Sequence, residues 1–193
     1  MKIAGILLAA GASQRFGIDD KLLVQLQGQP LVTHAAAALK ASEPDVLIGV
    51  TRTSSVANVL VGFENVICHE PRAQQSDSLK VGLKRAIELG ASKVVIALGD
   101  MPFVNEELIR AVVDCSTDSS PAAASDGKRS MPPVCFPSAY FDDLLALKGD
   151  RGATELLKNL PACAIIETPD LRLYDVDTPD ALLKAERISE HAL

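Results

Sequence analysis

The sequence has no excess of positive charge. Lysine and arginine number 19 together, against 25 for aspartate and glutamate, which gives a formal net charge of -6 over 193 residues. Such a chain generates no overall positive field, so we expect it to bind neither nucleic acid nor an anionic membrane surface. If its ligand is a polyphosphate, the attraction has to come from local cationic groups or from a metal ion.

Paired cysteines are lacking as well. The four cysteines are Cys68, Cys115, Cys135 and Cys163; they include no C-x-x-C pair, and no histidine lies nearby at the spacing of a zinc site. We interpret them as reduced, structural thiols, which favours a cytoplasmic protein.

Long apolar runs are also absent. No stretch approaches the length of about 18 residues that a membrane-spanning helix needs, so we expect no membrane association. Lys2 and the apolar residues 3–10 have some features of a signal peptide, but Gly5 interrupts the run. The small residues after this run are typical of the loop of a strand–helix unit, which again favours the cytoplasm.

Several hydrolase motifs are incomplete. His69-Glu70 is not followed by a histidine at position 73, as the zinc-protease pattern H-E-x-x-H requires, and no serine lies in G-x-S-x-G. The sequence therefore gives little support to a zinc protease or a serine hydrolase.

The sequence does contain a regular alternation of short apolar segments and amphipathic segments. Strands are expected at 2–8, 45–50, 65–69, 93–98, 133–136, 164–167 and 172–176, and helices at 30–41, 54–61, 78–89, 106–114, 140–147, 153–160 and 179–189. Ser76 or Ser78 is expected to cap the third helix and Gly90 to end it. The polar stretch 115–132 is expected to be a loop.

This order predicts an α/β fold over residues 1–193, in a single three-layer, Rossmann-like domain with a mostly parallel sheet between helices. The segment 93–98 is apolar at every position after Lys93, as expected of a strand that is covered on both faces. Sheets of this kind bind their ligands at the carboxyl ends of the strands, so residues that come directly after the strands are the first candidates for a site.

The first candidate is a loop of small residues after the first strand, Leu8-Ala9-Ala10-Gly11-Ala12-Ser13, with Arg15 and Lys21 shortly behind it. Small side chains let backbone N–H groups approach phosphates, and the two cations supply positive charge. The spacing is neither that of a Walker A loop nor that of G-x-G-x-x-G. A tight turn carrying two solvated cations explains the pattern equally well.

Acidic residues form the second candidate. Asp100 comes directly after the strand 93–98 and the single residue Gly99, at a position that suits a Mg²⁺ ligand shared with substrate phosphates. Asp175 and Asp177 would lie on one face of an extended segment and could complete a metal site with Asp100. Capping a turn or a helix is the alternative role for each of these aspartates. The segment 149–152, which contains Arg151, is interpreted as a turn rather than an anion site.

Five motifs in the same order resemble the MobA-like nucleotidyltransferases. They are the loop 8–17 with Lys21, Gln75-Ser76-Asp77-Ser78-Leu79 ahead of Gly82-Leu83, Gly99-Asp100-Met101-Pro102, Gly149-Asp150-Arg151-Gly152-Ala153, and Asp175-Val176-Asp177-Thr178-Pro179. Within this family the chain is most similar to the molybdenum cofactor cytidylyltransferase branch. The resemblance implies the nucleotide-diphospho-sugar transferase type of fold.

The resemblance also implies an activity: transfer of CMP from CTP to the phosphate of molybdopterin, with release of pyrophosphate. By motif, the loop Leu8 to Ser13 would hold the nucleotide, Arg15 and Lys21 would neutralise the triphosphate, and Ser78 would lie near the base. Asp100 and Asp177 would bind Mg²⁺. The catalytic group would therefore consist of Arg15, Lys21 and Asp100.

Two further features concern the nucleotide base and the phosphorylated acceptor. Ala10 resembles the CTP-using branch, because the GTP-using branch usually has glycine there, so GTP is the less favoured nucleotide. Residues 130–136 depart from the family pattern, which leaves open a different phosphorylated acceptor. A non-catalytic carrier that hands the pterin product to a molybdenum hydroxylase apoenzyme is a third hypothesis.

Overall fold

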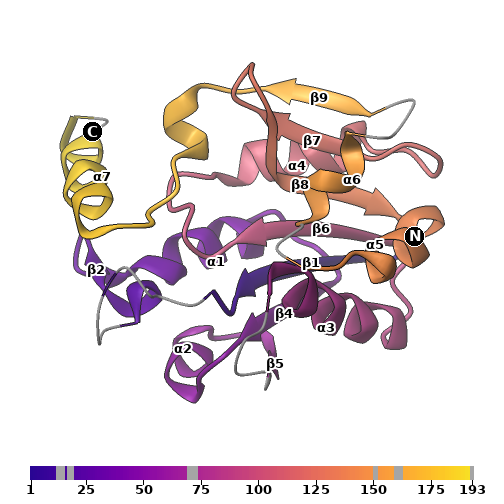
Figure 1. Cartoon of the computed structure of the whole chain (residues 1–193), viewed down its shortest axis with the longest axis horizontal. Coiled ribbons are helices and arrows are strands. Elements are labelled where there is room, and N and C mark those ends of the chain that lie inside the picture. Colours follow the sequence, from indigo (N-terminus) through magenta and orange to yellow (C-terminus); the bar gives the residue numbers. More distant parts are fainter. Residues whose placement is uncertain (12–15, 17–19, 69–73, 150–151, 159–162, 192–193) are drawn as a thin grey trace.

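Seven strands form one sheet in the described part of the chain. The structure is a computed structural model that describes residues 1–11, 16, 20–68, 74–149, 152–158 and 163–191. The strands are β1 (Ile3–Ala9), β4 (Val46–Thr51), β5 (Glu64–Ile67), β6 (Lys93–Leu98), β7 (Ala122–Ser125), β8 (Ser130–Pro137) and β9 (Ala164–Glu167). Their spatial order is β5-β4-β1-β6-β8-β7-β9. Of these, β8 runs against its neighbours and the others run parallel (Figure 1).

Helices cover both faces of the sheet. The larger ones are α1 (Leu31–Ala41), α2 (Ser54–Val59), α3 (Gln75–Glu88), α4 (Glu106–Cys115), α5 (Phe141–Ala146), α6 (Ala153–Leu157) and α7 (Pro179–His191). One apolar core lies under α3, α5 and α6, and the other lies under α1, α2 and α4. Strands β1 and β6 contribute alternate residues to the two cores, as expected for strands covered on both sides. The predicted three-layer α/β architecture is confirmed.

Helix α3 packs unusually close to the sheet because of Gly82. A Cβ atom at this position would lie 2.7 Å from Cγ2 of Val50 and 2.8 Å from Cγ2 of Ile6. Both distances are shorter than van der Waals contact, so a larger residue would push the helix away from β1 and β4. The glycine in the second motif is therefore explained by packing.

Most of the expected elements are confirmed with boundaries shifted by a few residues, but two expectations are wrong. The stretch 115–132 is not a continuous loop, because it contains β7 and the start of β8. Residues 172–176 are not a strand: a short 3₁₀ helix spans Asp170–Leu173, and an irregular segment comes after it. Asp175 and Asp177 therefore lie in that segment, directly ahead of α7.

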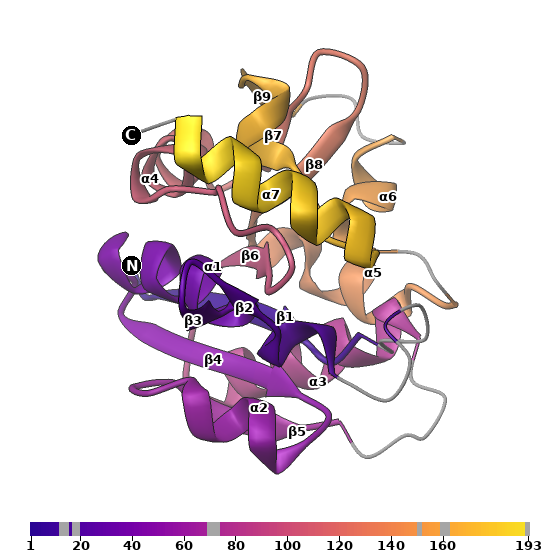
Figure 2. The same ribbon diagram turned by 90° about the vertical axis from the view of Figure 1, so that its left-hand side faces the viewer.

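The strands β1 and β6 end on the same side of the molecule, and α7 lies across that side (Figure 1 and Figure 2). Ala185 of α7 packs with Leu26, Leu31 and Val176 in a small separate cluster. This cluster fixes the segment ahead of α7 near the ends of the strands. Within the described ranges, no helix combines the length and the apolarity that crossing a bilayer would require.

Candidate functional site

Asp100 lies where the sequence predicted, just past the carboxyl end of β6. The backbone N–H of Gly99 donates to the carbonyl of Leu8 over 3.0 Å, which keeps the ends of β6 and β1 together. The backbone N–H of Val176 donates to the carbonyl of Asp100 over 2.9 Å. This second bond attaches the segment that carries Asp175 and Asp177 to the turn that carries Asp100.

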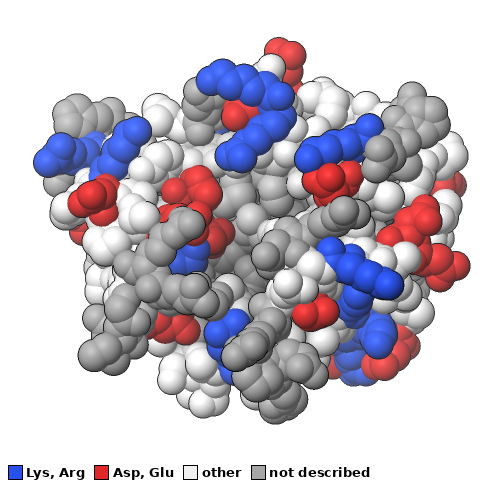
Figure 3. Space-filling view, in the orientation of Figure 1, with Lys and Arg blue, Asp and Glu red and all other residues white. Residues whose placement is uncertain are grey.

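Lys21 connects the two acidic motifs. Its Nζ lies 2.7 Å from Oδ2 of Asp100 and 2.6 Å from Oδ1 of Asp177. The side chain of Lys21 is only 8% exposed, that of Asp100 is 21% exposed, and that of Asp177 is 46% exposed. The three charged groups thus form one compact network at the carboxyl edge of the sheet. Figure 3 shows acidic and basic side chains next to one another on this side of the molecule.

The backbone of Lys21 is held by a short 3₁₀ helix, Lys21–Leu23. Asp20 caps this helix, since its Oδ1 accepts a hydrogen bond from the backbone N–H of Leu22. The side chain of Leu22 is buried and packs in the core beneath α1. The position of Lys21 therefore results from an apolar anchor one residue away and a capping aspartate before it.

Charge on Lys21 is stabilised in the folded protein. Burial alone would lower the pKa of its ammonium group, but the negative charges and hydrogen bonds of Asp100 and Asp177 outweigh burial. The net effect raises the pKa of Lys21 above its ordinary value of 10.5. Lys21 is accordingly a fixed cation at neutral pH.

Asp175 is in the opposite situation. Burial raises the pKa of its carboxyl group, and the nearby negative charges of Asp177 and Asp100 raise it further. A hydrogen bond to its own backbone and the positive charge of Arg129 partly oppose these effects. The carboxyl group of Asp175 therefore holds its proton more tightly than an isolated aspartate does.

One carboxylate oxygen of this network has no hydrogen-bond partner among the described residues. Oδ1 of Asp100 is buried and accepts no hydrogen bond from the residues that the structure describes. A buried, unpaired carboxylate oxygen is costly, and a divalent cation would satisfy it. Among the described residues, no group of three histidine, cysteine or acidic side chains is arranged to hold a metal. The arrangement thus fits a cation that takes one or two protein carboxylates and completes its shell with substrate oxygens.

The structure describes the first part of the small-residue loop. Leu8, Ala9 and Ala10 are buried at the end of β1, and Gly11 is exposed with open space where a Cβ would stand. This opening is compatible with a ligand that approaches the backbone closely. The predicted site residues Ala12, Ser13 and Arg15 lie outside the described residues, as does Arg151.

The start of α3 differs from expectation. The helix begins at Gln75, and its cap is Gln74, which forms a capping box with Asp77. Neither of the two expected caps, Ser76 and Ser78, caps the helix. Both lie inside it and are buried, and the hydroxyl of Ser76 has no hydrogen-bond partner among the described residues.

Sequence reasoning missed Ser76 as a candidate polar group. The signal was present, because Ser76 precedes Leu79 by three residues and Leu83 by seven and so shares the buried face of α3. Thr51 and Arg52, at the end of β4, were missed as well. Thr51 is paired in register with Ala9, and Oγ1 of Thr51 and Nε of Arg52 are buried with no hydrogen-bond partner among the described residues. No motif marked these two residues.

A cationic hairpin tip reaches the same edge of the sheet. Strand β8 is antiparallel to β6, with Ile96 opposite Val134 and Lys93 opposite Pro137, so the start of β8 lies toward the carboxyl end of β6. The tip 126–129 connects β7 to β8, and Oδ1 of Asp126 accepts hydrogen bonds from the backbone N–H groups of Lys128 and Arg129. The Arg129 side chain is 69% exposed. In Figure 3, basic side chains gather over this part of the molecule.

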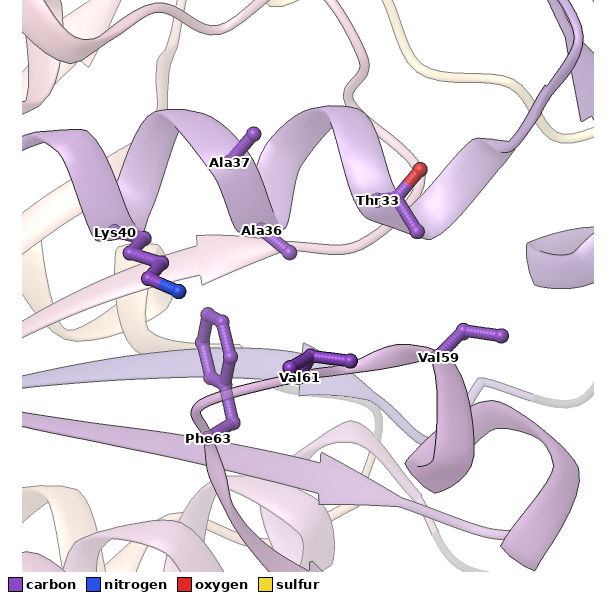
Figure 4. A pocket seen from close by; sticks show the side chains of 7 residues that line it. All are labelled: Thr33, Ala36, Ala37, Lys40, Val59, Val61 and Phe63. Atoms are coloured by element: carbon purple, nitrogen blue, oxygen red, sulfur yellow. The ribbon is translucent and has the colours of Figure 1, made fainter.

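A separate apolar pocket lies between α1 and the segment around α2 (Figure 4). Its volume is about 170 Å³, and its lining residues are Thr33, Ala36, Ala37, Lys40, Val59, Val61 and Phe63. None of the predicted site residues lines this pocket, so we do not associate it with the charged network.

This chain matches a protein-family model and is similar to several known proteins. The family model described as the MobA-like NTP transferase domain matches residues 5–164. Purine catabolism protein PucB of Bacillus subtilis is 30% identical and aligns over 92% of this chain and 93% of its own length. A molybdenum cofactor guanylyltransferase of Pseudomonas syringae is 28% identical, over 90% of this chain and 88% of its own length.

Among solved structures, Rv0371c of Mycobacterium tuberculosis in complex with manganese is similar, with a TM-score of 0.79 and 25% identity. The similarity covers 97% of this chain and 99% of that one.

Proposed function

Because this chain belongs to the MobA-like NTP transferase family, we propose that it is the nucleotidyltransferase that joins CMP, from CTP, to the terminal phosphate of molybdopterin. In this reaction an oxygen of the acceptor phosphate attacks the α-phosphorus of CTP. The bond between the α-phosphorus and the bridging oxygen breaks, and pyrophosphate leaves. No net redox change occurs, so the protein has to provide positioning and charge neutralisation.

The observation that carries this proposal is the buried cation at the carboxyl edge of the sheet. Nζ of Lys21 is held within 2.7 Å of both Asp100 and Asp177 and stays charged at neutral pH. A buried cation of this kind stabilises the negative charge that develops on phosphoryl oxygens. The two carboxylates come from positions 79 and 156 residues away along the chain and meet at this one ammonium group. Arg15, which the family motif pairs with Lys21, is proposed as the second cation.

Asp100 and Asp177 are the proposed ligands of Mg²⁺. The unpaired Oδ1 of Asp100 and the two-carboxylate donor set support this assignment. The manganese complex of Rv0371c supports a divalent cation in this fold. When bound, the cation would act as a Lewis acid on the phosphates and orient them.

The proposed nucleotide site is the loop Leu8 to Ser13 together with Ser78. CTP is favoured because residue 10 is alanine, whose buried methyl group leaves less room than glycine would. GTP is a second candidate, and the name of the Pseudomonas syringae relative favours it. Ala10→Gly is expected to weaken the preference for CTP over GTP; an unchanged ratio would show that this position does not read the base.

Pyrophosphate release tests the function directly. Purified protein is assayed with Mg²⁺ and each of the four nucleoside triphosphates, with and without molybdenum-loaded molybdopterin. We expect release that requires both CTP and the pterin. Pyrophosphate release with GTP and not with CTP would overturn the assignment of the base. Pyrophosphate release with CTP and a different phosphorylated acceptor would overturn the assignment of molybdopterin as the acceptor. CTP binding without release under any condition would favour a carrier.

A further inference from the structure

We propose that Lys21 weakens the affinity of the nucleotide-free site for divalent cations, so that the cation binds tightly only together with the nucleoside triphosphate. This inference rests on the proposed function for the identity of the two carboxylates as metal ligands. It concerns a property that the nucleotide-free protein has by itself, before any acceptor binds.

The geometry places Lys21 in competition with a cation. Its Nζ lies 2.7 Å from Oδ2 of Asp100 and 2.6 Å from Oδ1 of Asp177. A Mg²⁺ ion approaches its oxygen ligands to about 2.0–2.1 Å, so an ion shared by the same two carboxylates would lie next to the ammonium group. Two cations at such a separation repel strongly in a partly buried site. As long as Nζ stays between the carboxylates, free metal binds weakly.

The lysine can leave without unfolding the site. Its backbone is fixed by η1, the 3₁₀ helix Lys21–Leu23, and by the buried side chain of Leu22, so only the side chain has to rotate. A lysine side chain has four rotatable bonds and a compact ammonium group, which suits movement between two anionic partners. An anionic partner at either end of the movement stabilises the charge of the ammonium group.

A triphosphate supplies the alternative partner. Phosphate oxygens at the end of β1 would attract Nζ away from one or both carboxylates, and those carboxylates would then accept the metal that the nucleotide carries. Affinity for the metal and affinity for the nucleotide are thereby coupled, and the coupling is reciprocal. The unpaired Oδ1 of Asp100 offers the arriving ion a ligand that does not depend on Lys21.

The test measures Mn²⁺ binding to the nucleotide-free protein by the loss of the free Mn²⁺ signal in electron paramagnetic resonance. We compare the wild type with Lys21→Met, which keeps the length of the side chain and removes its charge. The expected result is at least tenfold tighter Mn²⁺ binding by the variant. Adding Asp177→Asn to the variant should reverse this gain, because it removes a ligand.

Lys93→Met is the matched control. Lys93 is also buried, but its Nζ donates to the carbonyl of Ser116 over 2.6 Å, at the opposite end of β6. Its replacement should leave Mn²⁺ affinity unchanged. A tenfold gain in both variants would mean that any lost positive charge strengthens binding, and it would overturn the proposal.

Equal Mn²⁺ affinity in the wild type and in Lys21→Met would also overturn the proposal. If Lys21→Met does not fold without metal, Lys21→Gln is measured in its place. Thermal unfolding without Mn²⁺ and with saturating Mn²⁺ is then the second measurement. If Mn²⁺ raises the Tm of the variant no more than it raises the Tm of the wild type, the proposal is contradicted. Neither measurement requires CTP, the pterin or turnover. A failed transferase assay therefore leaves this inference standing, and a failed Mn²⁺ test leaves the transferase assignment standing.

Discussion

Lys21 and Lys93 are both buried lysines, and they lie at opposite ends of the sheet. Lys93 opens β6, is 3% exposed and donates to a neutral carbonyl. Lys21 lies where β1 and β6 end and bridges two carboxylates. Burial of a lysine is thus found both at a structural position, Lys93, and at a candidate catalytic position, Lys21. The difference lies in the partners: opposite charge at the ligand-binding edge of a parallel sheet distinguishes the lysine that we propose to be functional.

The comparison is tested most strongly by removing each ammonium group in turn. Lys21→Met is expected to lower kcat by about a hundredfold or more, because it removes a preorganised cation that stabilises charge in the transition state. Lys93→Met should keep kcat within a few-fold of the wild type. Pyrophosphate release at saturating CTP and acceptor gives both values. A Lys21 variant in which only KM rises would reassign Lys21 to ground-state binding.

The exposed cation Arg129 can be compared with these two buried lysines. Arg129 lies at the tip between β7 and β8, near Asp175, and we expect it to attract the acceptor phosphate. Arg129→Gln should raise KM for the acceptor by roughly tenfold or less, the scale of one exposed charged contact, and leave KM for CTP unchanged. Lys158→Gln, which removes an exposed cation at the end of α6, is the control. Equal effects on both KM values would show that Arg129 acts on the site as a whole.

The smallest expected effect concerns Asp175 and the stability of the fold. Since its pKa is raised in the folded protein, the folded state binds its proton more tightly than the unfolded state does. Ionisation of Asp175 therefore costs stability as the pH rises from the unfolded pKa through the folded one. Asp175→Asn is expected to stabilise the protein at pH 7 by about 1 kcal/mol or less, because Asp175 is exposed and solvent screens its charge.

Urea unfolding of the wild type and Asp175→Asn at pH 7 and near pH 4 checks this prediction. The gain should shrink toward the lower pH, where the wild-type carboxyl is itself protonated. Lys21 has the same sign at a much higher pH: because its pKa is raised, its contribution to stability is full below pH 10.5 and is lost as the pH rises through the folded pKa. A gain in Asp175→Asn that is independent of pH would contradict the assignment.

Much of this fold could be predicted from the sequence because the inner strands are continuous apolar runs. The strand predicted over 93–98 has the observed bounds of β6. Strand β7 was missed because Ala122, Ala123 and Ala124 have little intrinsic preference for a strand. They are extended because β8 and β9 pair with them on either side and the positions are fully buried. Such pairing is set by the whole chain and not by its local pattern.

The candidate site shows the same limit. The edge of the sheet that carries Asp100 could be inferred from strand order and the position of the residue after β6. The contacts of Lys21 could not, because its partners lie 79 and 156 residues away along the chain. The role of Gln74 as a cap was also missed, because glutamine is a less typical capping residue than the serines beside it.

The bond from Val176 to the carbonyl of Asp100 has a consequence for the order of synthesis. All seven strands of the described sheet precede Asp177 in the chain, so a ribosome synthesises every strand before it adds the second carboxylate of the network. Lys21 and Asp100 are therefore present in the growing chain before Asp177 is. The charged network can form only after the segment ahead of α7 has been synthesised.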